Sequence, residues 1–189
     1  FNLVGFFVND EYSRPEYVDT DAFDVEAVSL ESEDCLMDAA VTVPADETEV
    51  PGVVLVHGND PNGTADKDLT AGGSKPFKDL AEGLASNGIA VLRYDRRTYA
   101  CPNSISSAAY TLDNVCVDDA LLAVKRLRSV PAVDAEQTFV VGLSLGGFAA
   151  PRIADRDGEL AGTVSMAAPG RSLYELVIDQ YEHLATVGD

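Results

Sequence analysis

Basic residues are scarce in this 189-residue chain, and their scarcity excludes several classes of partner. The sequence has 13 lysines and arginines against 32 aspartates and glutamates, which gives a formal net charge of −19. Nucleic acids and anionic membrane surfaces carry dense negative charge, so a protein of this sign repels them. We therefore expect neither nucleic acid nor a membrane among the partners of the chain.

The acidic residues are spread along the whole chain, and only four of the basic residues are lysines. This distribution resembles that of proteins from salt-loving microbes, in which acidic surfaces stay hydrated and concentrated salt screens their self-repulsion. An acidic protein from an ordinary habitat is the alternative. In either case the charge indicates a habitat rather than a reaction.

Cysteine is also scarce, and its spacing argues against a metal site. Cys35, Cys101 and Cys116 lack a C-x-x-C pair and have no histidine nearby, so neither zinc nor a redox motif is predicted. No organic cofactor is implied either. An odd number of cysteines argues against a complete disulfide framework, although Cys101 and Cys116 could close a loop in an oxidising compartment. We interpret all three as structural thiols.

Long hydrophobic runs and nucleotide-binding motifs are missing as well. The apolar start, FNLVGFFV, is far shorter than the ~20 residues of a membrane helix, and no basic segment precedes it as in a complete signal peptide. Because the chain does not begin with Met, we expect that something upstream has been removed. We expect a cytoplasmic protein, with secretion as the alternative. Neither G-x-G-x-x-G nor G-x-x-x-x-G-K-[ST] follows a strand, which argues against a nucleotide-binding domain.

The hydrophobic periodicity predicts an α/β core, residues 25–189, behind an N-terminal arm, residues 1–24, whose aromatic residues Tyr12, Tyr17 and Phe23 pin it to a surface. Strand-like runs at 25–30 and 39–44 predict an antiparallel hairpin. Buried strands then alternate with amphipathic helices: strands at 53–56, 89–95, 138–142 and 162–169, and helices at 76–88, 111–131, 146–158 and 172–184. This order predicts a mainly parallel, doubly wound sheet with helices on both faces and the strand at 53–56 near its centre.

The segment Gly142-Leu143-Ser144-Leu145-Gly146 has the G-x-S-x-G pattern between a predicted strand and a predicted helix. Glycines at both ends permit a turn sharp enough to expose the serine hydroxyl above the sheet, as in a nucleophile elbow. The N-terminus of the following helix adds unpaired N–H groups where an oxyanion would form. A glycine-rich turn with an ordinary hydroxyl, or one that cradles phosphate, is the alternative. We interpret Ser144 as a nucleophile.

A second feature, His57-Gly58-Asn59, follows the strand at 53–56. A serine hydrolase needs two backbone N–H donors for its tetrahedral oxyanion; Leu145 is the first candidate and Asn59 the second. Gly58 supports that loop. For His57 we favour a structural hydrogen bond to the backbone over a role as general base.

Four segments together resemble the α/β-hydrolase superfamily: VVLVHGNDPNGTADKDLT, KPFKDLAEGLASNGIAVLRYDRRT, DDALLAVKRLR and FVVGLSLGGFAAPRIA. The likeness extends from about Asp19 to about Tyr181 and is greatest to bacterial and archaeal hydrolases related to dienelactone hydrolases and serine aminopeptidases. It implies that a small ester-like substrate acylates Ser144 and that the His-Gly loop builds the oxyanion hole. Dienelactone hydrolases carry cysteine at the elbow, so Ser144 favours an esterase-like or, less strongly, a peptidase-like relative.

The resemblance includes RYDRRT, at the mouth of a strand beside the elbow. Asp95 and Arg96 in this segment either line the substrate entrance or pair with each other and fix the loop, and we favour the pairing. Tyr99 and Tyr110 indicate an apolar wall near the entrance.

In this family the triad order is serine, acid and histidine, with the acid after the seventh strand of the superfamily sheet and the histidine after the eighth. The only histidine after Ser144 is His183, and Asp179 precedes it by the four residues typical of a surface pair on a helix. We interpret that pair as structural rather than as base and acid. We therefore expect the front part of a serine hydrolase that lacks its last strands, acid and base, with a non-catalytic binding or assembly module as the alternative. An open sheet edge predicts self-association.

Overall fold

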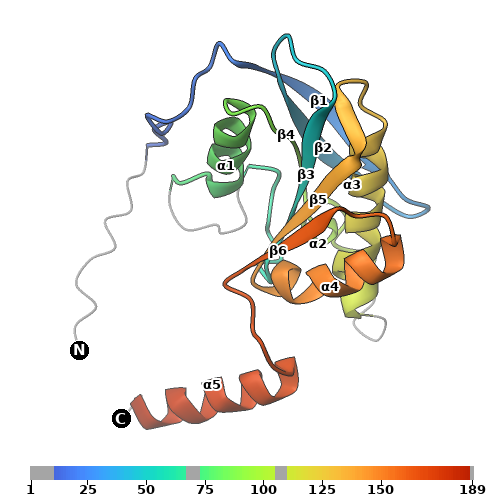
Figure 1. Ribbon diagram of the computed structural model, residues 1–189. Coiled ribbons are helices and arrows are strands. Elements are labelled where there is room, and N and C mark those ends of the chain that lie inside the picture. The colour runs from blue at the N-terminus through green and yellow to red at the C-terminus, as the bar shows by residue number, and fades with distance from the viewer. Residues whose placement is uncertain (1–10, 67–72, 105–109, 188–189) are drawn as a thin grey trace.

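A computed structural model describes residues 11–66, 73–104 and 110–187, which surround a six-stranded mixed sheet (Figure 1). The strands lie in the order β1-β2-β4-β3-β5-β6. Their bounds are Phe23–Glu31 (β1), Leu36–Pro44 (β2), Val50–Val56 (β3), Ala90–Tyr94 (β4), Val133–Leu143 (β5) and Gly162–Met166 (β6).

The strand pairing confirms the predicted hairpin and parallel sheet. β1 and β2 pair antiparallel from Phe23 opposite Pro44 to Glu31 opposite Leu36, and β2 pairs antiparallel with β4. From β4 onward every pair is parallel: β4 with β3, β3 with β5, and β5 with β6. β3 lies inside the sheet, as its unbroken apolar run predicts, because a strand covered on both faces has no solvent side to occupy with polar residues.

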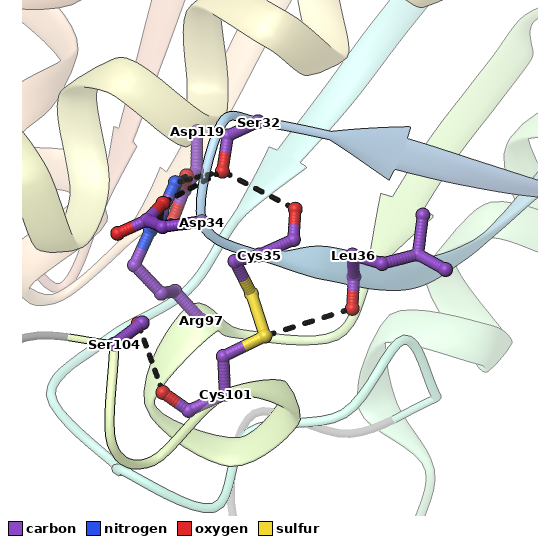
Figure 2. The surroundings of a disulfide bond; sticks show 8 residues. All are labelled: Ser32, Asp34, Cys35, Leu36, Arg97, Cys101, Ser104 and Asp119. Atoms are coloured by element: carbon purple, nitrogen blue, oxygen red, sulfur yellow. Dashed lines mark hydrogen bonds and ion pairs between the residues drawn. A yellow bond between two sulfur atoms is a disulfide. The ribbon is translucent and has the colours of Figure 1, made fainter.

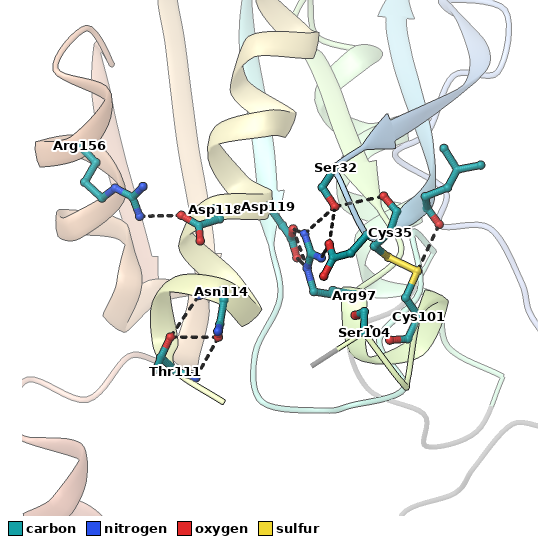
Figure 3. Close-up of polar contacts among 12 residues, drawn as sticks. Ser32, Cys35, Arg97, Cys101, Ser104, Thr111, Asn114, Asp118, Asp119 and Arg156 are labelled. Atoms are coloured by element: carbon teal, nitrogen blue, oxygen red, sulfur yellow. Dashed lines mark hydrogen bonds and ion pairs between the residues drawn. A yellow bond between two sulfur atoms is a disulfide. The ribbon is translucent and has the colours of Figure 1, made fainter. Parts of the chain in front are cut away.

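Helices cover both faces of the sheet, as predicted. Their bounds are Pro76–Ala85 (α1), Arg97–Ala100 (α2), Asp118–Arg128 (α3), Leu145–Asp157 (α4) and Leu173–Val187 (α5), and a π-helical segment, η2 (Asp113–Val117), leads into α3. The η2–α3 segment begins at a reciprocal cap in which the Thr111 and Asn114 side chains each accept the other's backbone N–H (Figure 3). Thr111 is therefore the capping residue.

The two faces of β3 bury alternate residues under different helices, because successive side chains of a strand point to opposite sides. Val53 and Leu55 pack with Phe77 of α1 on one face. Val54 and Val56 belong to the larger core on the other face, which α3 and α4 cover. α5 differs from these helices: none of its side chains is buried, and it stands off from the sheet (Figure 1). No helix in the described ranges is both long enough and apolar enough to cross a membrane.

The described part of the predicted arm lies along α1. The Tyr12 hydroxyl donates to Asp79 at 2.7 Å, and the Arg14 guanidinium donates to Glu82 at 2.7 Å. The Tyr17 ring lies against Gly83, where a Cβ atom would come within 2.6 Å of it. Tyr12 and Tyr17 thus pin the arm to a surface as predicted, whereas Phe23 is already the first residue of β1.

The cysteines pair differently from our expectation. Cys35 and Cys101 form a disulfide with 5.8 Å between their Cα atoms, so the interpretation of these two as thiols is wrong (Figure 2). A bridge between Cys101 and Cys116 is also wrong, since Cys101 is bonded to Cys35 and the Cys116 thiol is buried in the core outside any disulfide. The physical reason is the sheet order: β2 lies beside β4, so the β1–β2 turn that carries Cys35 reaches α2, which follows β4.

Candidate active site

Ser144 occupies the turn between β5 and α4 in a backbone conformation that few residues other than glycine adopt. Its φ is 52° and its ψ is −109°, and its side chain is exposed. Left-handed backbone at a residue with a Cβ costs about 1–3 kcal/mol, so surrounding contacts must hold it. The Ser144 N–H donates to the Met166 carbonyl of β6 at 2.8 Å, and the Ser144 carbonyl accepts the Phe148 N–H at 2.9 Å. The strand and the helix together therefore fix the turn that presents the hydroxyl.

Glycine is required on both sides of this turn because backbone atoms approach too closely for a Cβ. A Cβ on Gly142 would lie 2.3 Å from the Gly146 carbonyl, and one on Gly146 would lie 2.4 Å from the Val56 carbonyl of β3. Gly147, which sequence analysis did not single out, is similarly confined by Gly142 and Ala168. The two adjacent glycines, Gly146 and Gly147, are the feature of the sequence from which this close approach at Gly147 could have been predicted. Because of these close approaches, the start of α4 packs directly against the sheet.

A cavity of about 370 Å³ opens beside Ser144 and brings the three main candidates together: Ser144, Leu145 and Asn59 all line it. Most of the other lining residues are apolar and come from the segment before α3 and from α5. They are Tyr110, Thr111, Leu112, Val115, Pro169, Leu173, Leu176, Val177 and Gln180. Tyr110 is thus in the wall, as predicted, whereas Tyr99 is not among the residues that line the cavity. Within the described ranges, no charged side chain lines it.

Leu145 and Asn59 reach the cavity from different elements. Leu145 is the first residue of α4, so its N–H precedes the intrahelical hydrogen bonds and carries the partial positive charge of the helix N-terminus. Asn59 lies in the loop after β3, where it is exposed. No hydrogen bond joins its N–H to another residue of the described ranges. Leu145 and Asn59, which belong to separate elements, therefore line the same cavity as Ser144.

The His57 side chain forms the backbone hydrogen bond that we favoured, and its ring lies inside the protein. The side chain is buried, its Nε2 lies 2.6 Å from the Tyr94 carbonyl of β4, and the ring contacts the Phe77 ring in a tilted arrangement with 4.8 Å between centroids. A carbonyl can only accept, so Nε2 must carry a proton and donate. His57 thereby joins β3 to β4 directly below the Gly58-Asn59 loop.

His183 and Asp179 are not brought to Ser144. Both side chains are exposed on α5, and neither lines the cavity. Asp179 forms an ion pair with Arg171 instead of with His183. Asp179 therefore belongs to an ion pair on the surface, but its partner is Arg171 and not His183, the partner that the spacing predicted.

The expected pairing of Asp95 with Arg96 is wrong, although both residues do fix the loop after β3. The Asp95 carboxylate accepts the Ala65 N–H at 2.7 Å, and burial raises its pKa although that hydrogen bond opposes the rise. The Arg96 guanidinium donates to the Gly58 and Asp60 carbonyls. Both side chains turn from the strand mouth to the neighbouring loop, because β4 lies beside β3 in the sheet. Within the described ranges, no three histidine, cysteine or acidic side chains gather as metal ligands would.

Comparison with known proteins agrees with this geometry. Residues 53–186 match the alpha/beta hydrolase family. The chain is 38% identical over 178 residues to esterase EstD of Thermotoga maritima, a match that covers 94% of this chain and 40% of EstD. The chain therefore spans well under half the length of this curated relative.

Solved structures show the same fold at low identity. Brefeldin A esterase, a bacterial homologue of human hormone-sensitive lipase, aligns with a TM-score of 0.61 and 22% identity over 85% of this chain and 44% of its own. The dienelactone hydrolase-like promiscuous phosphotriesterase P91 aligns with a TM-score of 0.59 and 19% identity over 78% of this chain and 60% of its own. Fold, elbow and family match agree, and the chain belongs to the alpha/beta hydrolase family.

Proposed function

We propose that this chain carries the nucleophile and the oxyanion hole of a serine hydrolase that cleaves carboxylic esters. One observation carries the proposal: an exposed serine in a strained turn lines a cavity together with Leu145 and Asn59, and we assign the backbone N–H groups of these two residues to the oxyanion hole. The identity of 38% to a protein named an esterase supports the same reaction.

The reaction follows from the positions of these groups. The Ser144 hydroxyl oxygen attacks the ester carbonyl carbon, its proton passes to a base, and the carbonyl oxygen becomes an oxyanion that the two N–H groups bind. Collapse of the tetrahedral species expels the alcohol, which takes up a proton, and leaves an acyl-serine. Water then adds to the acyl carbon and releases the acid, which restores the hydroxyl.

The cavity indicates the class of substrate. Its walls are largely apolar and, in the described ranges, bear no charge, so they favour a neutral ester with an apolar acyl or alcohol group. A charged substrate would lose its hydration there without gaining a partner. Esters are therefore proposed ahead of peptides, whose two flanking amides need hydrogen-bond partners.

Neither histidine is placed to be the base. His57 donates to a backbone carbonyl in the interior, and His183 does not line the cavity. A serine without a base is a weak nucleophile. The proposal assigns the nucleophile and the oxyanion donors to this chain and leaves the base unassigned.

Intact-mass analysis after treatment with a fluorophosphonate, in concentrated salt, tests the assignment. We expect slow addition of one phosphonyl group, faster addition when imidazole is supplied as an external base, and no addition to Ser144→Ala. Ser129→Ala, at the far end of α3, is the matched control and is expected to react as the parent does. A folded parent chain that stays unmodified even with imidazole would overturn the proposal.

That negative result would favour the alternative, a binding or assembly module on a hydrolase fold. The position of both histidines outside the cavity is the observation in its favour. The same experiment distinguishes the two functions, because a hydrolase needs a reactive Ser144 hydroxyl. A binding or assembly module keeps the cavity but does not need that reactivity.

We also propose self-association through β6, the last strand of the sheet order, whose Val164 and Met166 are exposed. An open strand edge offers unpaired backbone groups to another chain. Sedimentation showing a clean monomer at working concentration would contradict it.

A further inference from the structure

Arg96 is a buried cation whose charge has no acidic partner in the described ranges. Its side chain is 2% exposed, and its Nε and Nη2 have no hydrogen-bond partner among the described residues. Its Nη1 donates to the carbonyls of Gly58 and, at 3.2 Å, of Asp60. A buried guanidinium satisfied only by carbonyl oxygens is costly, so its persistence needs a reason.

The geometry of the peptide bond supplies that reason. Gly58 C=O and Asn59 N–H belong to the same planar, trans peptide unit, in which the two groups point in opposite directions. The Gly58 carbonyl points inward to the Arg96 guanidinium. The Asn59 N–H must therefore point away from Arg96, and Asn59 lies on the wall of the cavity that contains Ser144.

The hydrogen bond also changes the strength of that donor. A positive group that donates to a carbonyl polarises the whole peptide unit, which makes the attached N–H a better donor. The effect is large where water is excluded, and Arg96 is almost completely buried. Because Asp60, on the other side of Asn59, is held by the same nitrogen, the guanidinium clamps the loop on both sides.

Arg96 is itself held in place by the segment that follows β4. Its N–H donates to the Gly63 carbonyl at 2.9 Å, and the Thr98 hydroxyl donates to the Pro61 carbonyl at 2.8 Å, so two more bonds join this segment to the same loop. The next residue, Arg97, is bound by Asp119, Asp34 and Ser32, and the disulfide lies one turn further on (Figure 2).

We propose that Arg96 is the positioning residue of the oxyanion hole: it orients and polarises the Gly58–Asn59 peptide so that the Asn59 N–H donates to the oxyanion formed at Ser144. The inference rests on the proposed serine hydrolase function. It goes beyond that function, since it names the group that makes one of the two donors effective.

Two readouts on Arg96→Met and Arg96→Lys test this role in the full chain, in concentrated salt. The first is the fluorophosphonate reaction with imidazole, resolved into its maximal rate and its half-saturating concentration. Because loss of one oxyanion donor costs about 10² to 10³ in rate, we expect Arg96→Met to lower the maximal rate about 100-fold with little change in half-saturation. Arg96→Lys keeps the charge and a donor and is expected to lose less, about tenfold.

The second readout needs no reaction at Ser144: the amide proton resonance of Asn59. We expect it to move upfield in Arg96→Met and by a smaller amount in Arg96→Lys, because the polarising hydrogen bond to Gly58 is lost or weakened. The control is Arg128→Gln, which removes a partly buried ion pair with Asp157 between α3 and α4 and is expected to change neither readout per folded molecule.

The outcomes separate the two proposals. An unreactive parent chain would overturn the serine hydrolase while the Asn59 resonance still reports on Arg96. An Asn59 resonance unchanged in a folded Arg96 variant would overturn the positioning role, as would an unchanged maximal rate. If Arg96→Met does not fold, Arg96→Lys provides both readouts.

Discussion

α4 and α5 are alike in sequence pattern and opposite in environment. Each is an amphipathic helix that follows a parallel strand, and α5 is the longer of the two. α4 buries Ala149, Ala150 and Ile153 completely, whereas α5 buries no residue. The small residues at the start of α4 let its backbone lie against the sheet, while α5 bears large apolar side chains, such as Tyr181 and Leu184, that remain exposed. Periodicity thus predicts a helix, but burial needs a facing surface.

The difference extends to the segments around each helix. The part of the chain that supports Ser144 and Asn59 is joined by the disulfide and by the buried Arg97–Asp119 pair. α5 is joined to its surroundings by the exposed pair of Arg171 with Asp179 and by its share of the cavity wall. The proposed nucleophile and oxyanion donors therefore lie on the anchored part of the chain, and one wall of the cavity lies on the unanchored part.

The largest expected effect comes from cutting the covalent anchor. Cys101→Ser opens a cross-link between residues 66 positions apart. A loop of this size restricts the unfolded chain by about 4 kcal/mol in the chain-entropy account, so we expect a loss of that order in the free energy of unfolding. Urea denaturation in concentrated salt measures it. Reductant should reproduce the loss in the parent and add nothing to the variant; a loss below about 1 kcal/mol would show that other contacts hold α2.

A matched pair of truncations tests the comparison of the two helices directly. Ile153→Ala in α4 removes a fully buried side chain and is expected to cost about 3 kcal/mol, within the usual range for such cavities. Leu184→Ala in α5 removes a side chain that is 61% exposed, and we expect a change within about 0.5 kcal/mol. Unfolding midpoints at equal salt give both values. Similar losses in the two variants would mean that α5 packs on the rest of the protein in solution.

Sequence patterns were sufficient for the alternation of strands and helices and for the sharp turn at Ser144, because both depend on local spacing. Each of these two features is set by residues close together in the chain. The candidate donors Leu145 and Asn59 were chosen by the same local reasoning, since Leu145 directly follows Ser144 and Asn59 lies in the loop that follows β3.

Contacts between segments far apart in the chain were not predictable in this way. Cys35 pairs with Cys101 because β2 and β4 are neighbours, an order that no local pattern specifies. For the same reason Arg96 was expected to pair with the adjacent Asp95, whereas its partner carbonyls lie on the loop after β3. Adjacent opposite charges suggest an ion pair. In the folded protein, however, the Asp95 and Arg96 side chains bind different parts of the loop after β3.

The smallest expected effect concerns the ion pair between Arg14 and Glu82, which joins α1 to the N-terminal arm. Burial alone would raise the pKa of Glu82, but the Arg14 and Lys78 cations lower it overall. A carboxylate with a lowered pKa adds stability above the pH at which the unfolded chain titrates, about 4.3 for glutamate, and this contribution is lost as pH falls further. Because Arg14 is partly exposed, we expect Glu82→Gln to cost only about 1 kcal/mol at pH 7 and less at pH 3.5.

Denaturation of the parent and of Glu82→Gln at both pH values measures that difference. Glu175→Gln, on the exposed surface of α5, is the matched control and is expected to show no difference at either pH. A cost for Glu82→Gln that stays the same at both pH values would mean that shape, not charge, holds the arm. In that case α1 would resemble α4, which is held by packing. If the cost of Glu82→Gln disappears in acid, α1 stands between α4 and α5, because it is held to the arm only while the Glu82 carboxylate is ionised.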